Sequence, residues 1–267
     1  MKTNINGEHV FVYQGKAESD VIFVSENPSI IFIHGAQQDH SCWTLQSRWF
    51  AHHGFNTFVP DLPGHGMSGG RALSSVGEMA KWIIDLVHQL KLDRVHLVGH
   101  SMGSLVALEA ALQYQERIRK IILIGTSLPM PVSDVLLDAA QNSEGKAIAM
   151  VNNFSHSSQG QLGRNSVPGM WMLGTNQRLM ERQEKGVFLS DLSACNQYIP
   201  DENQIKSLTI PVLIIAGLED KMTSAKSAMN LAQQISGAKL CQIKGAGHAL
   251  MAESPDKVLD CLIDFTA

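Results

Sequence analysis

Short apolar runs that alternate with amphipathic segments are the feature of this 267-residue sequence that most constrains its fold. The runs have the length and the β-branched content of buried strands, and the segments between them have the period of helices. The predicted strands cover residues 29–34, 55–60, 95–98, 120–124, 212–216 and 238–243. The predicted helices cover residues 43–53, 74–90, 102–114, 224–235 and 255–265. Because such strands pair in parallel through crossovers, we expect an α/β fold with a mostly parallel central sheet flanked by helices.

Two parts of the chain depart from this alternation. Residues 8–13 and 21–25 are rich in β-forming residues, so two further strands are predicted near the start. Between residues 127 and 206 the strand signal disappears, and short helical windows alternate with Gly and Pro. We therefore predict a core of residues 1–126 and 207–267, interrupted by an inserted helical cap. Such a cap usually covers the carboxyl ends of the strands, where ligands bind.

Composition and charge exclude several classes of protein. The chain is 44% hydrophobic and 17% charged, unlike collagen-like or disordered sequences. Its net charge is −4 and it has no basic block, so neither nucleic acid nor an anionic membrane is expected as a partner. The four cysteines lack the spacing of a metal site or a disulfide framework. With a polar start and no long apolar run, the sequence predicts a soluble, cytoplasmic protein.

The pentapeptide Gly99-His100-Ser101-Met102-Gly103 is the most informative motif, because it lies between a predicted strand and a predicted helix. A chain that turns abruptly from strand to helix crowds its own backbone two residues before and after the apex, and Gly99 and Gly103 relieve this crowding. Ser101 would then lie at a helix N-terminus, whose N–H groups favour developing negative charge. This context favours a nucleophile over the alternative, a capping serine in a tight turn.

A serine nucleophile needs an adjacent base and an orienting acid, and both types of residue follow late strands. The predicted strand 212–216 ends in an acidic turn that contains Glu219 and Asp220. The predicted strand 238–243 ends in a glycine-rich loop that contains His248. Since neighbouring side chains diverge, only one of the two carboxylates can face the histidine.

With its order Ser, Asp, His, the chain resembles the α/β-hydrolase family over essentially its whole length outside the cap. Besides the pentapeptide, the resemblance rests on His34-Gly35-Ala36 followed by Trp43, Asp61-Leu62-Pro63-Gly64-His65-Gly66-Met67-Ser68, Gly217-x-x-Asp220 and Gly247-His248. The family spacing from Gly217 favours Asp220 over Glu219 as the acid. A proline that is common shortly after the acid in this family is absent here.

The resemblance implies roles for individual residues. Ser101 is the expected nucleophile, His248 the general base and acid, and Asp220 the carboxylate that orients the histidine. The backbone N–H groups of Ala36 and Met102 are expected to form the oxyanion hole.

The substrate site is expected to include His34 and Gly35 of the loop at the end of the third predicted strand, residues 29–34, together with Met170 and Trp171 of the cap. Thioether side chains adapt to varied ligand shapes, although most Met and aromatic residues of the cap are expected to pack in its own core. His34 is also a candidate for orienting its loop.

No cofactor or metal is predicted. The segment from Gly64 to Gly69 satisfies a dinucleotide-binding pattern, but it neither follows a strand directly nor opens a helix, so we interpret it as a coincidental turn. The neighbouring His52 and His53 have no carboxylate at ligand spacing.

These observations predict a serine hydrolase that cleaves a small carboxylic ester through an acyl-enzyme intermediate. The same triad serves carbon–carbon bond hydrolases, lactonases, thioesterases and perhydrolases, so these alternatives stay open. Epoxide and haloalkane chemistry is disfavoured, because those relatives have Asp where this chain has Ser101. A ligand-binding relative without turnover is a further alternative. The expected partner is a small ester or acyl compound, and the sequence does not predict the oligomeric state.

Overall fold

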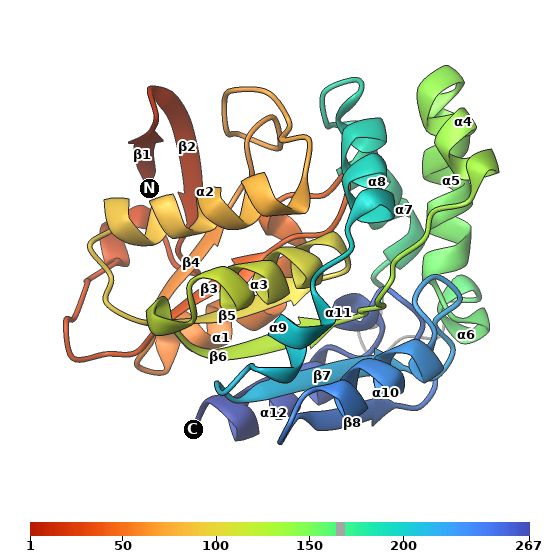
Figure 1. Cartoon of the computed structure of the whole chain (residues 1–267). Coiled ribbons are helices and arrows are strands. Elements are labelled where there is room, and N and C mark those ends of the chain that lie inside the picture. The colour runs from red at the N-terminus through yellow and green to blue at the C-terminus, as the bar shows by residue number, and fades with distance from the viewer. Residues whose placement is uncertain (164–168) are drawn as a thin grey trace.

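A central, mostly parallel sheet organises the protein. The computed structural model describes residues 1–163 and 169–267, and within them an eight-stranded sheet has the order β1-β2-β4-β3-β5-β6-β7-β8 (Figure 1). The strands are β1 (Lys2–Ile5), β2 (Glu8–Tyr13), β3 (Ser29–Ile33), β4 (Asn56–Pro60), β5 (Val95–His100), β6 (Ile118–Ile124), β7 (Val212–Gly217) and β8 (Lys239–Ile243). Every pair from β4 to β8 is parallel, whereas β1 and β2 form an antiparallel hairpin on the edge of β4. The predicted α/β class is therefore confirmed.

The start of the chain corrects one prediction. Residues 21–25 form no strand, and the side chain of Ile22 is 80% exposed. The strand β2 already has β1 on one side and β4 on the other, so its edges are both occupied. The backbone N–H and carbonyl of Val24 instead bond to the side-chain amide of Asn56. Conversely, β1 was not predicted, because it is a mainly polar strand whose one buried residue is Ile5.

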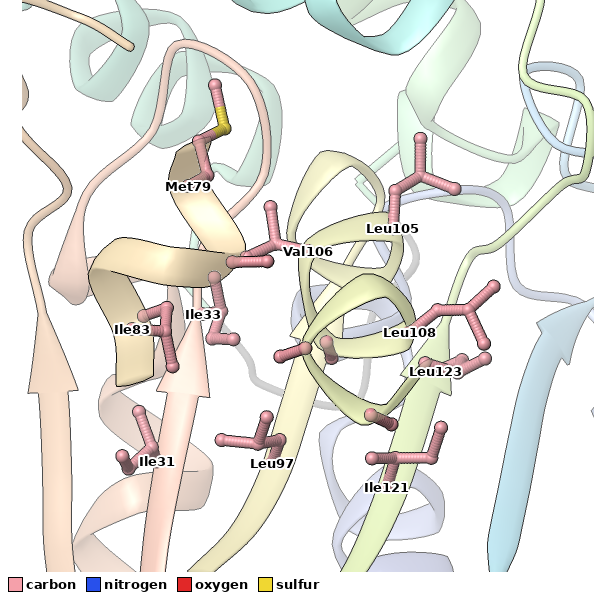
Figure 2. Packing of buried hydrophobic residues seen from close by; sticks show 14 of the residues in the cluster. Ile31, Ile33, Met79, Ile83, Leu97, Leu105, Val106, Leu108, Ile121 and Leu123 are labelled. Carbon is pink, nitrogen blue, oxygen red and sulfur yellow. The ribbon is translucent and has the colours of Figure 1, made fainter. Parts of the chain in front are cut away.

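Helices cover both faces of the sheet. On one face lie α2 (Val76–Gln89), α3 (Met102–Gln113) and α10 (Ala225–Gln234), and on the other lie α1 (Thr44–His52) and α12 (Pro255–Thr266). Alternate residues of each strand point to opposite faces, so both faces of the central strands are apolar. Figure 2 shows one of these layers, where side chains of β3, β5 and β6 meet α2 and α3. Its labelled residues are Ile31, Ile33, Met79, Ile83, Leu97, Leu105, Val106, Leu108, Ile121 and Leu123.

A group of helices separates β6 from β7, as the predicted helical cap requires. It consists of α4 (Asp134–Asn142), α5 (Glu144–Ser155), α6 (Ser158–Gln161), α7 (Met172–Glu181), α8 (Val187–Gln197) and α9 (Glu202–Lys206). In Figure 1, α4, α5, α7 and α8 gather at one end of the sheet. They have a small apolar core of their own, which includes Ile148, Met180 and Phe188. Residues 164–168 of the predicted cap lie outside the described residues.

Candidate active site

The turn between β5 and α3 holds Ser101 in an unusual conformation. Its φ is 53° and its ψ is −119°, a strained combination for a residue with a Cβ that costs about 1–3 kcal/mol. A Cβ added at Gly99 would overlap the carbonyl oxygen of Gly103, and one added at Gly103 would overlap the carbonyl oxygen of Ile33. The surrounding backbone therefore admits only glycine at these two positions. The N–H of Ser101 donates to the carbonyl of Ile124 at 2.9 Å, which fixes the turn against β6.

Asp220 and His248 lie together at the ends of β7 and β8. His248 Nδ1 is 2.8 Å from Asp220 Oδ2. The same carboxylate accepts the N–H groups of Met222 and Thr223 on Oδ1 and the hydroxyl of Thr223 on Oδ2. Burial alone would raise the pKa of Asp220, but the neighbouring charge and N–H of His248 and the Thr223 donors hold that pKa below its ordinary value. An ionised carboxylate is thus held against the imidazole.

The rival acid Glu219 takes a different place. Its N–H donates to the carbonyl of Ala246 at 2.9 Å, and its side chain is partly exposed. Among the described residues, no hydrogen bond or ion pair joins the Glu219 carboxylate to His248. The structure brings Asp220, and not Glu219, to the histidine.

The loop after β3 approaches the serine closely. A Cβ added at Gly35 would lie 3.3 Å from the Cβ of Ser101, so this glycine lets the loop reach the nucleophile turn. Ala36 follows and lines the same cavity as Ser101 and His248. Met102 has its side chain buried in the core, and its N–H belongs to the first turn of α3, where N–H groups lack partners within the helix.

A large cavity lies between the cap and these loops. Its volume is about 1100 Å³, and Ser101 and His248 form part of its wall. Most of the chain's 12 methionines line it, far more than the sequence analysis expected. These are Met130, Met150, Met170, Met172, Met180, Met222 and Met251. Of the predicted substrate-site residues, Gly35, Met170 and Trp171 line the cavity, with the Trp171 side chain 72% exposed at its rim.

His34, also predicted to contact substrate, is not among the residues that line this cavity. Its ring is fully buried, with Nδ1 2.9 Å from the carbonyl oxygen of Gly35 and Nε2 accepting the N–H of Leu62 at 3.1 Å. Burial, with the nearby charge of His65, lowers its pKa to about 4. His34 is therefore a neutral brace between two loops, and both of its ring nitrogens are already used.

A second buried pair connects the core to the cap. His65 Nε2 is 2.9 Å from Asp191 Oδ2 on α8, and its Nδ1 is 3.0 Å from the carbonyl of Pro63. Asp191 Oδ2 also accepts the N–H of Gln37, the residue after Ala36. Burial alone would lower the pKa of His65, but the Asp191 carboxylate raises it above its ordinary value. No sequence pattern predicted a role for Asp191, because its partners are remote along the chain.

One cluster has the composition of a cation site. Ligand atoms of Asp39, His40 and Asp61 all lie within 4.8 Å of one another. However, the Asp39 carboxylate is engaged by Arg182, at distances down to 2.6 Å. Asp61 accepts the N–H of His40 at 2.7 Å and that of Met67 at 2.9 Å. With these bonds in place, the cluster is explained as a brace between loops.

Comparison with known proteins agrees with this fold. Residues 28–255 match the model of the α/β-hydrolase fold family, so the chain belongs to this family and the resemblance found in the sequence is confirmed. It is 24% identical to a 2-hydroxy-6-oxononadienedioate/2-hydroxy-6-oxononatrienedioate hydrolase of Klebsiella pneumoniae, over 90% of this chain and 87% of that protein. It is 25% identical to carboxylesterase YbfK of Bacillus subtilis, over 89% of this chain and 80% of that one.

Solved structures show the same architecture. The enol-lactonase of Burkholderia xenovorans superimposes with a TM-score of 0.86, at 19% identity, over 100% of this chain and 99% of the other. Among the described residues, every helix is too short or too polar to cross a membrane. Family and relatives together make the chain a hydrolase of the α/β-hydrolase family.

Proposed function

We propose that this hydrolase cleaves a small carboxylic ester through an acyl-enzyme intermediate, with Ser101, His248 and Asp220 as its triad. The observation that carries the proposal is the 2.8 Å contact of His248 Nδ1 with Asp220 Oδ2. His248 and the strained Ser101 line the same cavity. A hydroxyl is a weak nucleophile by itself, and this arrangement supplies both a base and a group that fixes the tautomer of the base.

The proposed reaction has two halves. Ser101 Oγ attacks the acyl carbon while His248 Nε2 takes its proton, and the N–H groups of Ala36 and Met102 stabilise the oxyanion. His248 then protonates the leaving alcohol, and afterwards activates the water that releases the acid. The position of Ser101 at the start of α3 adds the favourable field of a helix N-terminus.

We further propose that residues 127–206 act as a cap that encloses the substrate, with Gly35, Met170 and Trp171 in contact with it. The support is the apolar, methionine-lined wall, which suits an apolar acyl or alcohol group of adaptable shape. His34 has no part in this contact, because its ring nitrogens are bonded elsewhere.

A carbon–carbon bond hydrolase or a lactonase is the second candidate. It is favoured by the likeness to the Klebsiella pneumoniae hydrolase and to the enol-lactonase, each over at least 87% of both chains. A panel that contains aryl esters, lactones and a vinylogous 1,5-diketone separates these activities. The ester proposal requires the highest kcat/KM on an ester.

The nucleophile is tested by covalent labelling. A fluorophosphonate should label the wild-type protein with one equivalent per chain, as read by intact mass, and should leave Ser101→Ala unlabelled. Ser133→Ala is the matched control, because Ser133 also lines the cavity but caps α4 through its side chain. Equal labelling of wild type and Ser101→Ala would overturn the assignment.

A further inference from the structure

Among the described residues of the cap that line the cavity, His156 has a buried side-chain nitrogen without a hydrogen-bond partner. His156 follows α5, is fully buried and forms part of the cavity wall. Its Nδ1 is 2.9 Å from the carbonyl oxygen of Asn152, so in the neutral ring Nδ1 carries the hydrogen and donates it. Nε2 then has a lone pair, and no group of the described residues satisfies it. A buried acceptor without a partner costs about 1–3 kcal/mol, which a bound donor would recover.

The backbone on one side of His156 is bonded to the catalytic loop. The carbonyl of Ser155 accepts the N–H of Ala249, the residue after His248, at 2.9 Å. A Cβ added at Gly247, the residue before His248, would lie 2.8 Å from that same carbonyl oxygen. The cap segment therefore passes directly over the loop that carries the proposed base.

A buried carboxylate holds the other side of His156. Glu253 accepts both the N–H and the hydroxyl of Ser157 at 2.8 Å, and it also accepts the N–H of Gly247 at 2.5 Å. Both neighbours of His156 are thus tied to the loop around His248. The imidazole is held in place before any ligand arrives, which lowers the entropy lost when it makes a hydrogen bond.

The buried side-chain atoms around the cavity that lack a partner among the described residues are all hydrogen-bond acceptors. Among the described residues that line it, buried polar side-chain atoms without a partner are Gln38 Oε1, His100 Nδ1 and His156 Nε2. Burial lowers the pKa of His100 to about 3, and its Nε2 lies 2.9 Å from the carbonyl oxygen of His248, so its Nδ1 is an acceptor. All three atoms accept hydrogen bonds, and the rest of the wall is mainly apolar.

We propose that His156 Nε2 is a recognition site for a hydrogen-bond donor, a hydroxyl or an N–H, carried by the substrate away from the bond that is cleaved. This inference rests on the proposed function and narrows its substrate class. The preferred ester is largely apolar, to match the methionine-lined wall, and bears one donor that reaches the cap. A site that hydrogen-bonds a substrate hydroxyl discriminates against the analogue without it, because its buried acceptor is then left unpaired.

The test uses methyl hexanoate and the isomeric methyl monohydroxyhexanoates, which bear the hydroxyl on successive acyl carbons, with hydrolysis followed by pH-stat. We expect at least one isomer to have a kcat/KM about tenfold above that of the parent ester, the equivalent of one good hydrogen bond. In His156→Phe the ratio of hydroxylated to parent kcat/KM should fall about tenfold. In His156→Gln, whose amide oxygen can accept a hydrogen bond, the ratio should recover in part.

His88→Phe is the matched control, since His88 is exposed on α2, and its ratio should equal that of wild type. The inference is overturned if wild type prefers no hydroxylated isomer, or if the preference survives in a folded His156→Phe. If His156→Phe fails to fold, the inference is tested by the kcat/KM ratio of hydroxylated to parent ester in wild type and in His156→Gln. Hydrolysis of the parent ester that depends on Ser101, without any hydroxyl preference, defeats this inference alone. Hydrolysis that persists in Ser101→Ala defeats the proposed function instead.

Discussion

Replacing Asp220 by Asn tests the proposed triad without dismantling its loop. The Oδ1 atom of Asp220 accepts the N–H groups of Met222 and Thr223, and an Asn oxygen can keep both bonds. The Asn amide nitrogen then occupies the place of Oδ2, 2.8 Å from His248 Nδ1. Because that nitrogen donates, Nδ1 must become the acceptor and the ring proton moves to Nε2. Nε2, the nitrogen proposed to face Ser101, then carries a hydrogen and has no lone pair with which to take the proton of Ser101.

The expected cost follows from this change of tautomer. A geometry-preserving Asp-to-Asn change of this type lowers kcat by about 10⁴-fold, or about 5 kcal/mol in the barrier. The fold should persist, because the two backbone bonds to Oδ1 remain. We therefore expect a large loss of kcat on an aryl ester, with a melting temperature within a few degrees of wild type.

Glu219→Gln is the matched control, as it removes a carboxylate one residue away that does not face His248. Its kcat should stay within about twofold of wild type, the small effect expected of a substitution that removes no contact of the reacting groups. Stopped-flow release of 4-nitrophenol measures both variants. The reasoning is refuted if folded Asp220→Asn keeps kcat within tenfold of wild type, or if Glu219→Gln is the variant that loses activity.

Three other predictions concern the turn, the cap and the cavity. Gly99→Ala should lower the free energy of unfolding by about 3 kcal/mol, because the added Cβ meets rigid backbone. Gly145→Ala has open space around the added Cβ and should change the free energy of unfolding by less than about 1 kcal/mol. Urea titration compares the two variants, and equal effects would contradict the crowding argument. The raised pKa of His65 means that its pairing with Asp191 stabilises the fold fully below the unfolded-state pKa of about 6.5 and is lost as pH rises through the folded-state pKa. His65→Gln should therefore flatten the fall in the free energy of unfolding as pH rises above about 6.5, and an unchanged pH profile would argue against the pair. Finally, kcat/KM on unsubstituted esters should rise with acyl length from acetyl to octanoyl by up to about fourfold per methylene, since the cavity is large and apolar; a fall beyond butanoyl would show that less of it is open to the acyl chain.

The sheet was predictable because its signal is local. The strands β3, β6 and β7 contain short apolar runs, and β4, β5 and β8 are apolar in part. The helices between the strands have apolar residues at the helical period. The hairpin at the start of the chain was not predictable, because its first strand, β1, is mainly polar and is defined by its pairing with β2. Residues 21–25 have the composition of a strand, but both edges of β2 are occupied, and the backbone of Val24 bonds to the Asn56 side chain instead. Composition describes what a segment favours, and topology decides whether a partner exists.

The proposed triad was predictable for a related reason. Ser101 follows β5 directly, and Asp220 and His248 lie in the loops after β7 and β8. Because parallel strands end at the same edge of the sheet, chain order alone places such residues near one another. The methionine wall was underestimated, because helical spacing shows that a residue is buried without showing whether it faces a core or a cavity. The position of His34 in its loop predicted a contact with substrate, but both of its ring nitrogens are bonded within the protein, to the backbone of Gly35 and of Leu62.

Contacts between the cap and the core had no sequence signal, yet they bear on the chemistry. Glu253 joins residues 96 positions apart when it binds Ser157, and it also holds the N–H that precedes His248. Asp191 lies 154 positions from Gln37 and binds the N–H that follows Ala36. The proposed base and the proposed oxyanion loop are therefore each fixed by a bond that involves the cap. Since the cap also supplies most of the cavity wall, a substitution in it that changes substrate preference should also change kcat, because both depend on the same helices.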